Sequence, residues 1–219
     1  MKKIASRLGV SPGSVHLWTS DIEITAEQAA RNKLEAGLLR GAVWAEKNRQ
    51  RRLRYQQEGR ERARGGDALH QAGCMLYWAE GAKARNSVGF ANSDVQMVRF
   101  FCRFIKEYFE TPPERFTFSL NVYTGNGLSI GEVEGHWLEA LELPRSCLRK
   151  HVINHFPTSS SGTKRHRLPY GVGRLCLNDS RVIQHIYGAI QEYAGFEEPR
   201  WLDGPPQKRR PKKRAPDRV

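Results

Sequence analysis

The sequence predicts an α+β protein in which an N-terminal helix-turn-helix and a long helix precede an α/β domain with a four-stranded, mainly antiparallel sheet. Two observations predict this class. Apolar residues recur at helical spacing in several segments, and between these segments they alternate with polar residues over short runs. The length of 219 residues suits a small domain joined to a medium one. We divide the chain into a helix-turn-helix (1–24), a basic linker helix (25–66), the α/β domain (67–196) and a disordered basic tail (197–219).

The charge of the chain is strongly positive and unevenly distributed. Lys and Arg number 36 against 23 Asp and Glu, which gives a formal net charge of +13. Clustered positive charge of this size is typical of proteins that bind polyanions, above all nucleic acids. The alternative is a solvated surface that only keeps the protein in solution.

The first 24 residues have the pattern of a helix-turn-helix. Gly9 permits a tight turn, Ser11 is a good N-cap, and Pro12 suits the first position of the second helix. The apolar residues expected between the two helices are Ile4, Ala5, Leu8, Val15 and Trp18. The pattern resembles the helix-turn-helix of bacterial regulators and recombinases, whose second helix enters the major groove; the alternative is a plain helical hairpin.

Such modules normally have another helix before these two. Either the helix after Thr25 completes the core, or the true start of the protein lies upstream. Side chains of the second helix are the candidates for contact with bases, and basic side chains of the first are the candidates for contact with phosphates. The first group is Ser11, Gly13, Ser14 and His16, and the second is Lys2, Lys3 and Arg7.

The linker helix begins with a capping box formed by Thr25 and Gln28. From Lys47 onward it is rich in arginine and contains few acids, which favours contact with a phosphate backbone over an exposed linker, the alternative. The candidates for contact with DNA in this helix are Arg51, Arg52 and Arg54. Gly65–Gly66 ends the helix and predicts a domain boundary.

The next helix is expected over residues 68–81, after Asp67 as its cap. It is apolar nearly all round and is therefore expected to be buried. Glu80 lies at its end, and a carboxylate there needs a cation, a hydrogen-bond donor or solvent. A hard divalent metal held between two such carboxylates would satisfy it.

The remaining elements follow from the alternation of polar and apolar residues and from caps and prolines. Strands are expected at 87–92, 116–122, 151–156 and 170–177. Helices are expected from Asp94 to the prolines at 112–113, over 131–141 and over 180–194.

The segment Met75–Gly81 resembles the LAGLIDADG helix of homing endonucleases, and the resemblance covers roughly residues 68–195. In that family two such helices pack side by side, and the acid at each helix end helps to hold Mg²⁺ between the scissile phosphates. The resemblance therefore implies that Glu80 is a catalytic residue and a Mg²⁺ ligand. A single motif implies a homodimer formed through the 68–81 helix, and the family's sheet lies in the major groove. The family also includes sporulation regulators that kept the DNA-binding fold and lost cleavage.

Further basic candidates lie between and on the last two strands. Residues 158–167 are expected to form a polar hairpin loop that contacts phosphates or guanines, with a mobile surface loop as the alternative. The candidates are Lys164, Arg165, His166 and Arg167 of this loop, and Arg174 of the following strand. The tail from 197 is expected to add unspecific attraction to DNA.

The sequence thus predicts a sequence-specific protein that binds double-stranded DNA, with a regulatory role. The alternative is a Mg²⁺-dependent homing-type endonuclease; RNA is a further possible partner, against which the helix-turn-helix argues. The four cysteines form no C-x-x-C pair, and no Walker A loop or G-x-S-x-G motif is present, which disfavours zinc sites and two common enzyme classes. No apolar run is long enough to span a bilayer, so we expect a cytoplasmic protein associated with the bacterial nucleoid.

Overall fold

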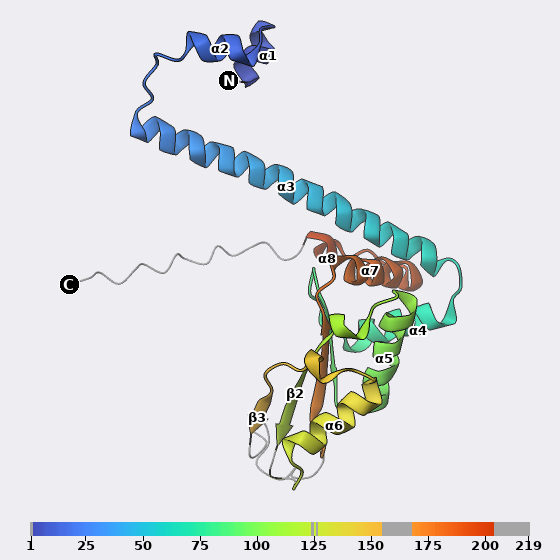
Figure 1. Cartoon of the computed structure of the whole chain (residues 1–219). Helices are drawn as coiled ribbons and strands as arrows, with labels where there is room; N and C mark the ends of the chain where they lie inside the picture. The colour runs from blue at the N-terminus through green and yellow to red at the C-terminus, as the bar shows by residue number, and fades with distance from the viewer. Residues whose placement is uncertain (1, 124, 126, 155–167, 204–219) are drawn as a thin grey trace, which may run out of the picture. The chain divides into compact units, whose positions relative to one another are not determined.

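The computed structural model describes residues 2–123, 125, 127–154 and 168–203 (Figure 1). The chain forms two compact units, Met1–Asn48 and Arg49–Val219, which are described separately. They divide within a helix, whereas the sequence suggested Gly65–Gly66 as the boundary. Within the described residues the fold is α+β with a four-stranded mixed sheet, as the sequence predicted at this coarse level.

The first unit contains α1 (Lys2–Leu8), α2 (Pro12–Trp18) and the beginning of α3 (Ala26–Ala63). Gly9 adopts φ +65° in the turn, and Ser11 Oγ accepts a hydrogen bond from the Ser14 N–H at 3.0 Å, so both local predictions are confirmed. Ala5 and Val15 are buried between α1 and α2. The expectation that Trp18 packs back on the first helix is wrong, because this side chain is 61% exposed. Two helices of two turns each have too little surface to cover it.

Helix α3 begins at the predicted capping box. The Thr25 N–H donates to Gln28 Oε1 at 3.1 Å, and the Gln28 N–H donates to Thr25 Oγ1 at 3.2 Å. The helix then runs without interruption to Ala63, and its second half packs on α7 (Ser180–Ala194) in the second unit.

Two glycines let α3 and α7 approach each other closely. A Cβ atom at Gly59 would lie 2.0 Å from the His185 carbonyl oxygen, and one at Gly188 would lie 1.9 Å from the Gln56 carbonyl oxygen. Beside this contact, three buried glutamines join the helices and their surroundings. Gln56 Nε2 donates to Gln184 Oε1 at 2.7 Å, and Gln191 Nε2 donates to Gln56 Oε1 at 3.4 Å. The amide nitrogen of Gln184 bonds to the backbone: Gln184 Nε2 donates to the carbonyl oxygens of Arg85 and Trp201.

The second unit continues with helices interleaved between strands. In chain order it contains α4 (Ala68–Glu80), β1 (Val88–Asn92), α5 (Val95–Tyr108), the 3₁₀ turn η1 (Pro113–Arg115), β2 (Thr117–Tyr123), α6 (Ile130–Leu141), η3 (Arg145–Cys147), β3 (Val152–Asn154), β4 (Val172–Leu177), α7 and α8 (Pro199–Asp203). The caps Asp67 and Asp94 form as predicted, each accepting backbone N–H groups of the helix that it precedes. The strand order is β1-β4-β2-β3; the β1–β4 and β4–β2 pairs are antiparallel and β2–β3 is parallel.

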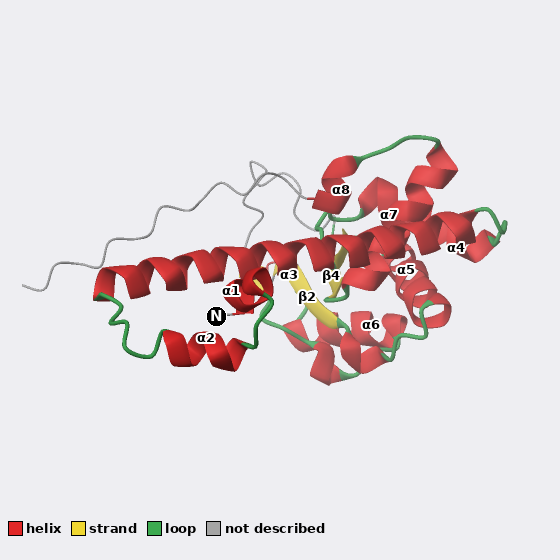
Figure 2. Ribbon diagram, turned by 90° about the horizontal axis from the view of Figure 1, so that it is seen from above, coloured by secondary structure: helices red, strands yellow, loops and turns green. Residues whose placement is uncertain are grey.

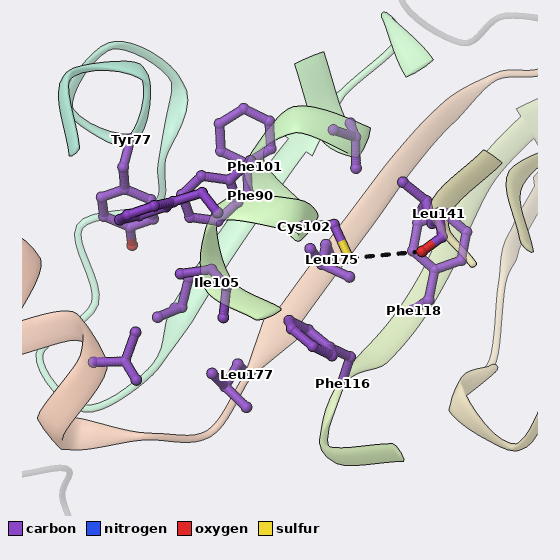
Figure 3. Packing of buried hydrophobic residues seen from close by; sticks show 14 of the residues in the cluster. Tyr77, Phe90, Phe101, Cys102, Ile105, Phe116, Phe118, Leu141, Leu175 and Leu177 are labelled. Carbon is purple, nitrogen blue, oxygen red and sulfur yellow. Dashed lines mark hydrogen bonds between the residues drawn. The ribbon is translucent and has the colours of Figure 1, made fainter. Parts of the chain in front are cut away.

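Helices cover one face of this sheet. In Figure 1, α4, α5 and α6 lie to the right of the strands, and Figure 2 shows the same arrangement from above. Figure 3 shows the core that they enclose, where Phe101 stacks on both Tyr77 and Phe90, and Leu175 and then Phe118 lie farther along the core. The alternation of side chains in β2 and β4 places every second residue in this core.

The end of the chain differs from the prediction. Residues from 197 onward were expected to form the disordered tail, but Pro199–Asp203 is the helix α8. Leu202 is buried, and the Trp201 ring stacks on Tyr187 with centroids 4.5 Å apart, so apolar burial orders this segment. The basic part of the tail, 204–219, lies outside the described residues.

Candidate nucleic-acid interface

The face of the sheet opposite the core carries polar and small side chains. In β2 and β4, Phe118, Leu120 and Leu175 are buried on the core side. The residues that alternate with them along each strand are half-buried or exposed. We call this second surface the open sheet face. Its residues are Ala91, Thr117, Ser119, Asn121, Tyr123, Val152, Asn154, Val172, Arg174 and Cys176.

Arg174 lies at the middle of the open sheet face. The strand register places it between Ala91 of β1 and Ser119 of β2. Both neighbours are small, so they leave room around the guanidinium group, which is exposed. Within the described ranges no residue forms an ion pair or hydrogen bond with the Arg174 side chain. Its donors are therefore open to a ligand that approaches this face.

The outer edge of the open sheet face depends on a bulge at His151. Phe118 pairs with Leu148 and Asn121 with Val152, so the edge segment contains one residue more than β2 between the two pairs. At this point the Leu120 N–H donates to His151 Nδ1 at 3.2 Å instead of to a backbone carbonyl. Nδ1 must therefore be the unprotonated nitrogen, and Nε2–H donates to Glu134 Oε1 at 2.9 Å.

Glu134 of α6 fixes the orientation of the His151 ring. Its other oxygen accepts a hydrogen bond from Arg145 Nη2 at 2.5 Å. Burial raises the pKa of this carboxyl, but the hydrogen bonds from His151 and Arg145 outweigh burial and lower the pKa below its ordinary value. The ionised carboxylate thus holds the imidazole in one tautomer, and the imidazole holds β3 beside β2. No feature of the sequence pattern indicated this group.

The residues of α1 and α2 that were predicted to contact DNA differ in their surroundings. Lys2, Arg7, Gly13 and His16 are exposed. Ser11 and Ser14 bond to each other, Oγ to Oγ at 3.0 Å, so part of their capacity serves the cap of α2. The side chain of Lys3 lies outside the described part of the structure.

Several arginines of α3 form hydrogen bonds or ion pairs with other described residues. Arg52 Nε donates to the Leu202 carbonyl oxygen at 2.8 Å. Arg54 Nε lies 3.7 Å from Glu58 Oε1, one helical turn away. Arg51 is exposed, and the described residues give it no ion pair. Other arginines in this helix and directly after it pair across the unit: Arg49 with Asp203, Arg60 with Glu197, and Arg64, which follows the helix, with Glu192. The positive charge of this segment is thus partly balanced by acids from residues 192–203.

Glu80 is exposed at the end of α4. Asn92 Nδ2 donates to Glu80 Oε2 at 3.4 Å. The nearby Lys83 Nζ instead donates to the carbonyl oxygens of Trp78 and Gly81, each at 2.7 Å, and caps the helix. Among the described residues no cation pairs with Glu80.

The surroundings of Glu80 do not form a metal site within one chain. In the described segments no three His, Cys, Asp or Glu residues come together as a ligand group. Asn92 Oδ1 is already an acceptor for the Asp94 N–H at 2.9 Å. Mg²⁺ is usually held by one or two carboxylates in addition to water and substrate oxygens. A Mg²⁺ site at Glu80 would therefore need ligands beyond those that the described residues group around it, for example from a second copy of the chain.

Helix α4 is not buried on all sides, contrary to the prediction. Its inner side consists of His70, Gly73, Cys74 and Tyr77. The opposite side carries a row of small exposed residues interrupted by the half-buried Met75. This row, at spacings of four, three and four, is Ala68, Ala72, Met75 and Ala79.

Two further predictions meet the limits of the described chain. The basic candidates Lys164, Arg165, His166 and Arg167 lie outside the described residues. In the parts that are described, none of the helices combines the length and apolar character needed to cross a bilayer.

Comparison with known proteins assigns no family to this arrangement. The chain matches no protein-family model, no curated protein and no solved structure.

Proposed function

We propose that this chain binds double-stranded DNA in a sequence-specific, regulatory role, through the open sheet face and the N-terminal helix-turn-helix. The observation that carries the proposal is the exposed Arg174, which has no partner among the described residues and lies among small and polar side chains on the face of the sheet opposite the core. Packing of the core does not explain these polar side chains, because they lie on the other face of the sheet. The net charge of +13 supports a polyanionic ligand.

The open sheet face has the chemistry needed to read base edges. An arginine can donate two hydrogen bonds to guanine O6 and N7, and an asparagine can form two with adenine. Arg174 and Asn121 stand on neighbouring strands of this face, with Ser119 opposite Arg174. The major groove is about 12 Å wide and admits strands as well as helices. The exposed Lys2 and Arg7 of the first unit would contact phosphates, which position a protein without specifying sequence.

The test is selection of bound duplexes from a random library, followed by fluorescence anisotropy on the enriched sequence at several salt concentrations. We expect affinity to fall steeply with salt, because bound cations are released from DNA. Arg174→Gln should weaken binding to the selected site by about tenfold and leave binding to unrelated DNA nearly unchanged. Arg103→Gln is the matched control, since this exposed arginine lies on α5 and pairs with Glu107. Absence of salt-dependent binding to any duplex would reject the proposal.

A second candidate function is DNA cleavage by a dimer. Two observations favour it: Glu80 is exposed without a cationic partner among the described residues, and α4 presents the row of small residues beside it. A homodimer formed through α4 would bring two Glu80 carboxylates together, and Mg²⁺ held between them would supply Lewis-acid stabilisation of the phosphate charge.

Cleavage and dimer formation can be tested separately. Plasmid and library cleavage with Mg²⁺ should show nicking by the unmodified protein that Glu80→Gln abolishes. Sedimentation of the unmodified protein and of Ala72→Glu should show a dimer that the substitution disrupts. Tight DNA binding with no cutting by either protein leaves the regulatory function and excludes the nuclease.

A further inference from the structure

A second candidate site lies where the end of α3, the turn η1 and the first turn of α7 meet. A cavity of about 400 Å³ opens there. Each of these elements contributes one arginine to its lining: Arg62, Arg115 and Arg181. Thr111 and His185 line it as well. None of these residues belongs to the open sheet face.

Two buried residues that line this cavity each have one polar side-chain atom without a hydrogen-bond partner among the described residues. Thr111 is 4% exposed and His185 is 8% exposed. In the described chain no hydrogen bond is formed by Thr111 Oγ1 or by His185 Nδ1. Buried polar atoms in folded proteins nearly always have a partner, and those that do not need an explanation. A ligand in the cavity would supply it.

The arginines at the cavity keep free donors. Arg62 Nε donates to the Tyr108 hydroxyl at 2.6 Å, Arg115 Nη2 donates to Asp179 Oδ2 at 2.9 Å, and Arg181 Nε lies 3.7 Å from Glu58 Oε2. Arg62 Nη2 is also 4.0 Å from the Asp67 carboxylate. A guanidinium group has five N–H donors, so each arginine retains several.

Two carboxylates also line the cavity and must be considered. Asp179 is fully engaged, because Oδ1 accepts the backbone N–H groups of Arg181 and Val182 and Oδ2 accepts Arg115. Glu110 is exposed, so solvent and salt screen its charge. Among the side chains that line the cavity, three guanidinium groups therefore face two carboxylates, whereas Asp67 and Glu58, which pair with Arg62 and Arg181, lie outside the lining.

A chain of hydrogen bonds can turn His185 into a donor while every group stays neutral. His70 Nε2 lies 3.0 Å from His185 Nε2, and His70 Nδ1 lies 2.8 Å from the Tyr193 hydroxyl. If Tyr193 donates to His70 Nδ1, then His70 Nε2–H donates to His185 Nε2. His185 must then carry its proton on Nδ1, the nitrogen without a partner among the described residues.

We propose that this cavity binds a phosphate-class oxyanion, with Thr111 Oγ1–H and His185 Nδ1–H donating from the buried side and the arginines donating from the exposed side. Tyr193 and His70 act as positioning residues that set the tautomer of His185. The cavity volume exceeds that of one phosphate ion, so a phosphate monoester fits the same chemistry. Its source is either a small molecule or the terminal phosphate of a nucleic-acid strand.

The first experiment is calorimetric titration of the full chain with inorganic phosphate, with sodium chloride at equal ionic strength as the blank. We expect one saturable site. Thr111→Val keeps the shape of the side chain and removes the hydroxyl, and it should weaken binding about tenfold. Arg99→Gln is the control, because this arginine lies on α5 outside the cavity, and it should leave the affinity unchanged.

The second experiment tests the positioning role. Tyr193→Phe removes the hydroxyl that donates to His70 Nδ1, so the tautomer of His70, and with it the donor on His185 Nδ1, is no longer fixed. Phosphate affinity should fall, and ¹⁵N NMR should show the change of tautomer at both imidazoles. Circular dichroism checks that each variant is folded.

The source is distinguished by comparing a mononucleotide with duplexes that carry or lack a 5′-phosphate. A gain from the 5′-phosphate that disappears in Thr111→Val identifies a strand end, and binding of the mononucleotide alone identifies a small molecule. The proposal is overturned if phosphate shows no saturable binding above the chloride blank. It is equally overturned if Thr111→Val and Tyr193→Phe bind phosphate as tightly as the unmodified chain. Neither result depends on whether the open sheet face binds DNA.

Discussion

Gly188 of α7 lies against the backbone of Gln56 in α3, so closely that a Cβ atom would be 1.9 Å from the Gln56 carbonyl oxygen. The second half of α3 is therefore part of the folded core of its unit. The first prediction follows. Gly188→Ala forces the two helices apart and should lower the free energy of unfolding by about 3 kcal/mol or more, measured by urea denaturation. Gly135→Ala is the control, because no atom lies within 4 Å of the Cβ position in α6; it should be neutral or stabilise by about 0.5–1 kcal/mol. Equal stabilities for the two variants would contradict the close packing of α3 on α7.

The second prediction concerns the buried histidine pair. Burial lowers the pKa of His70 to about 4 and that of His185 to about 3, the latter with help from the positive charge that His70 would carry. The unfolded chain takes up these protons near pH 6.5 and the folded chain does not, so stability should fall as pH decreases from about 6.5.

The slope of that loss approaches about 1.4 kcal/mol per pH unit for each histidine. Urea midpoints at pH 7, 6 and 5 measure it above the range in which the carboxyls titrate. His185→Gln should reduce the slope, whereas His16→Gln, on an exposed position of α2, should not. A urea midpoint that stays constant from pH 7 to pH 5 would show that the pair is not buried in neutral form.

The third prediction concerns the bulge beside β2. His151→Leu leaves the N–H of the buried residue Leu120 without its acceptor, which should cost about 1–3 kcal/mol. Hydrogen exchange at the Leu120 amide should accelerate selectively. Arg145→Gln removes only the exposed partner of Glu134 and should cost less than about 1 kcal/mol. Unchanged exchange at Leu120 in His151→Leu would argue against the imidazole as the acceptor.

The fourth prediction concerns the end of α4. Lys83→Met removes the ammonium group that caps three carbonyl oxygens, those of Tyr77, Trp78 and Gly81. We expect a loss of about 1 kcal/mol and increased exchange in the last turn of the helix. Lys150→Met, at an exposed position before β3, is the control. If both variants unfold at the same urea concentration as the parent, the cap contributes nothing.

Local signals in the sequence predicted the elements well. The capping box at Thr25 and the caps at Asp67 and Asp94 mark the starts of three helices. In each case a side chain close in sequence accepts hydrogen bonds from the first free N–H groups of the helix. The alternation around Phe118 identified β2 for a similar reason: burial on one face has a period of two.

Contacts between distant segments were beyond such reasoning. The arginines of α3 looked like a surface for phosphates, but Arg49 and Arg60 meet acids more than 130 residues away in the chain. The contact between Trp201 of α8 and Tyr187 of α7 joins two separate elements, so no local pattern in either segment indicated it. For the candidate site, alternation placed Arg174 on a strand surface, but only the strand order showed that its neighbours are Ala91 and Ser119.

The three buried glutamines between α3 and α7 have a further consequence. An amide both donates and accepts, so Gln56, Gln184 and Gln191 satisfy one another only when the two helices meet at one particular level. If α3 were shifted by one helical turn along α7, several buried amide groups would lose their hydrogen-bond partners, which costs free energy. Aliphatic side chains at the same positions have no such partners to lose, so the shift would cost them far less. These three glutamines thus favour one alignment of α3 along α7 over alignments shifted by a helical turn.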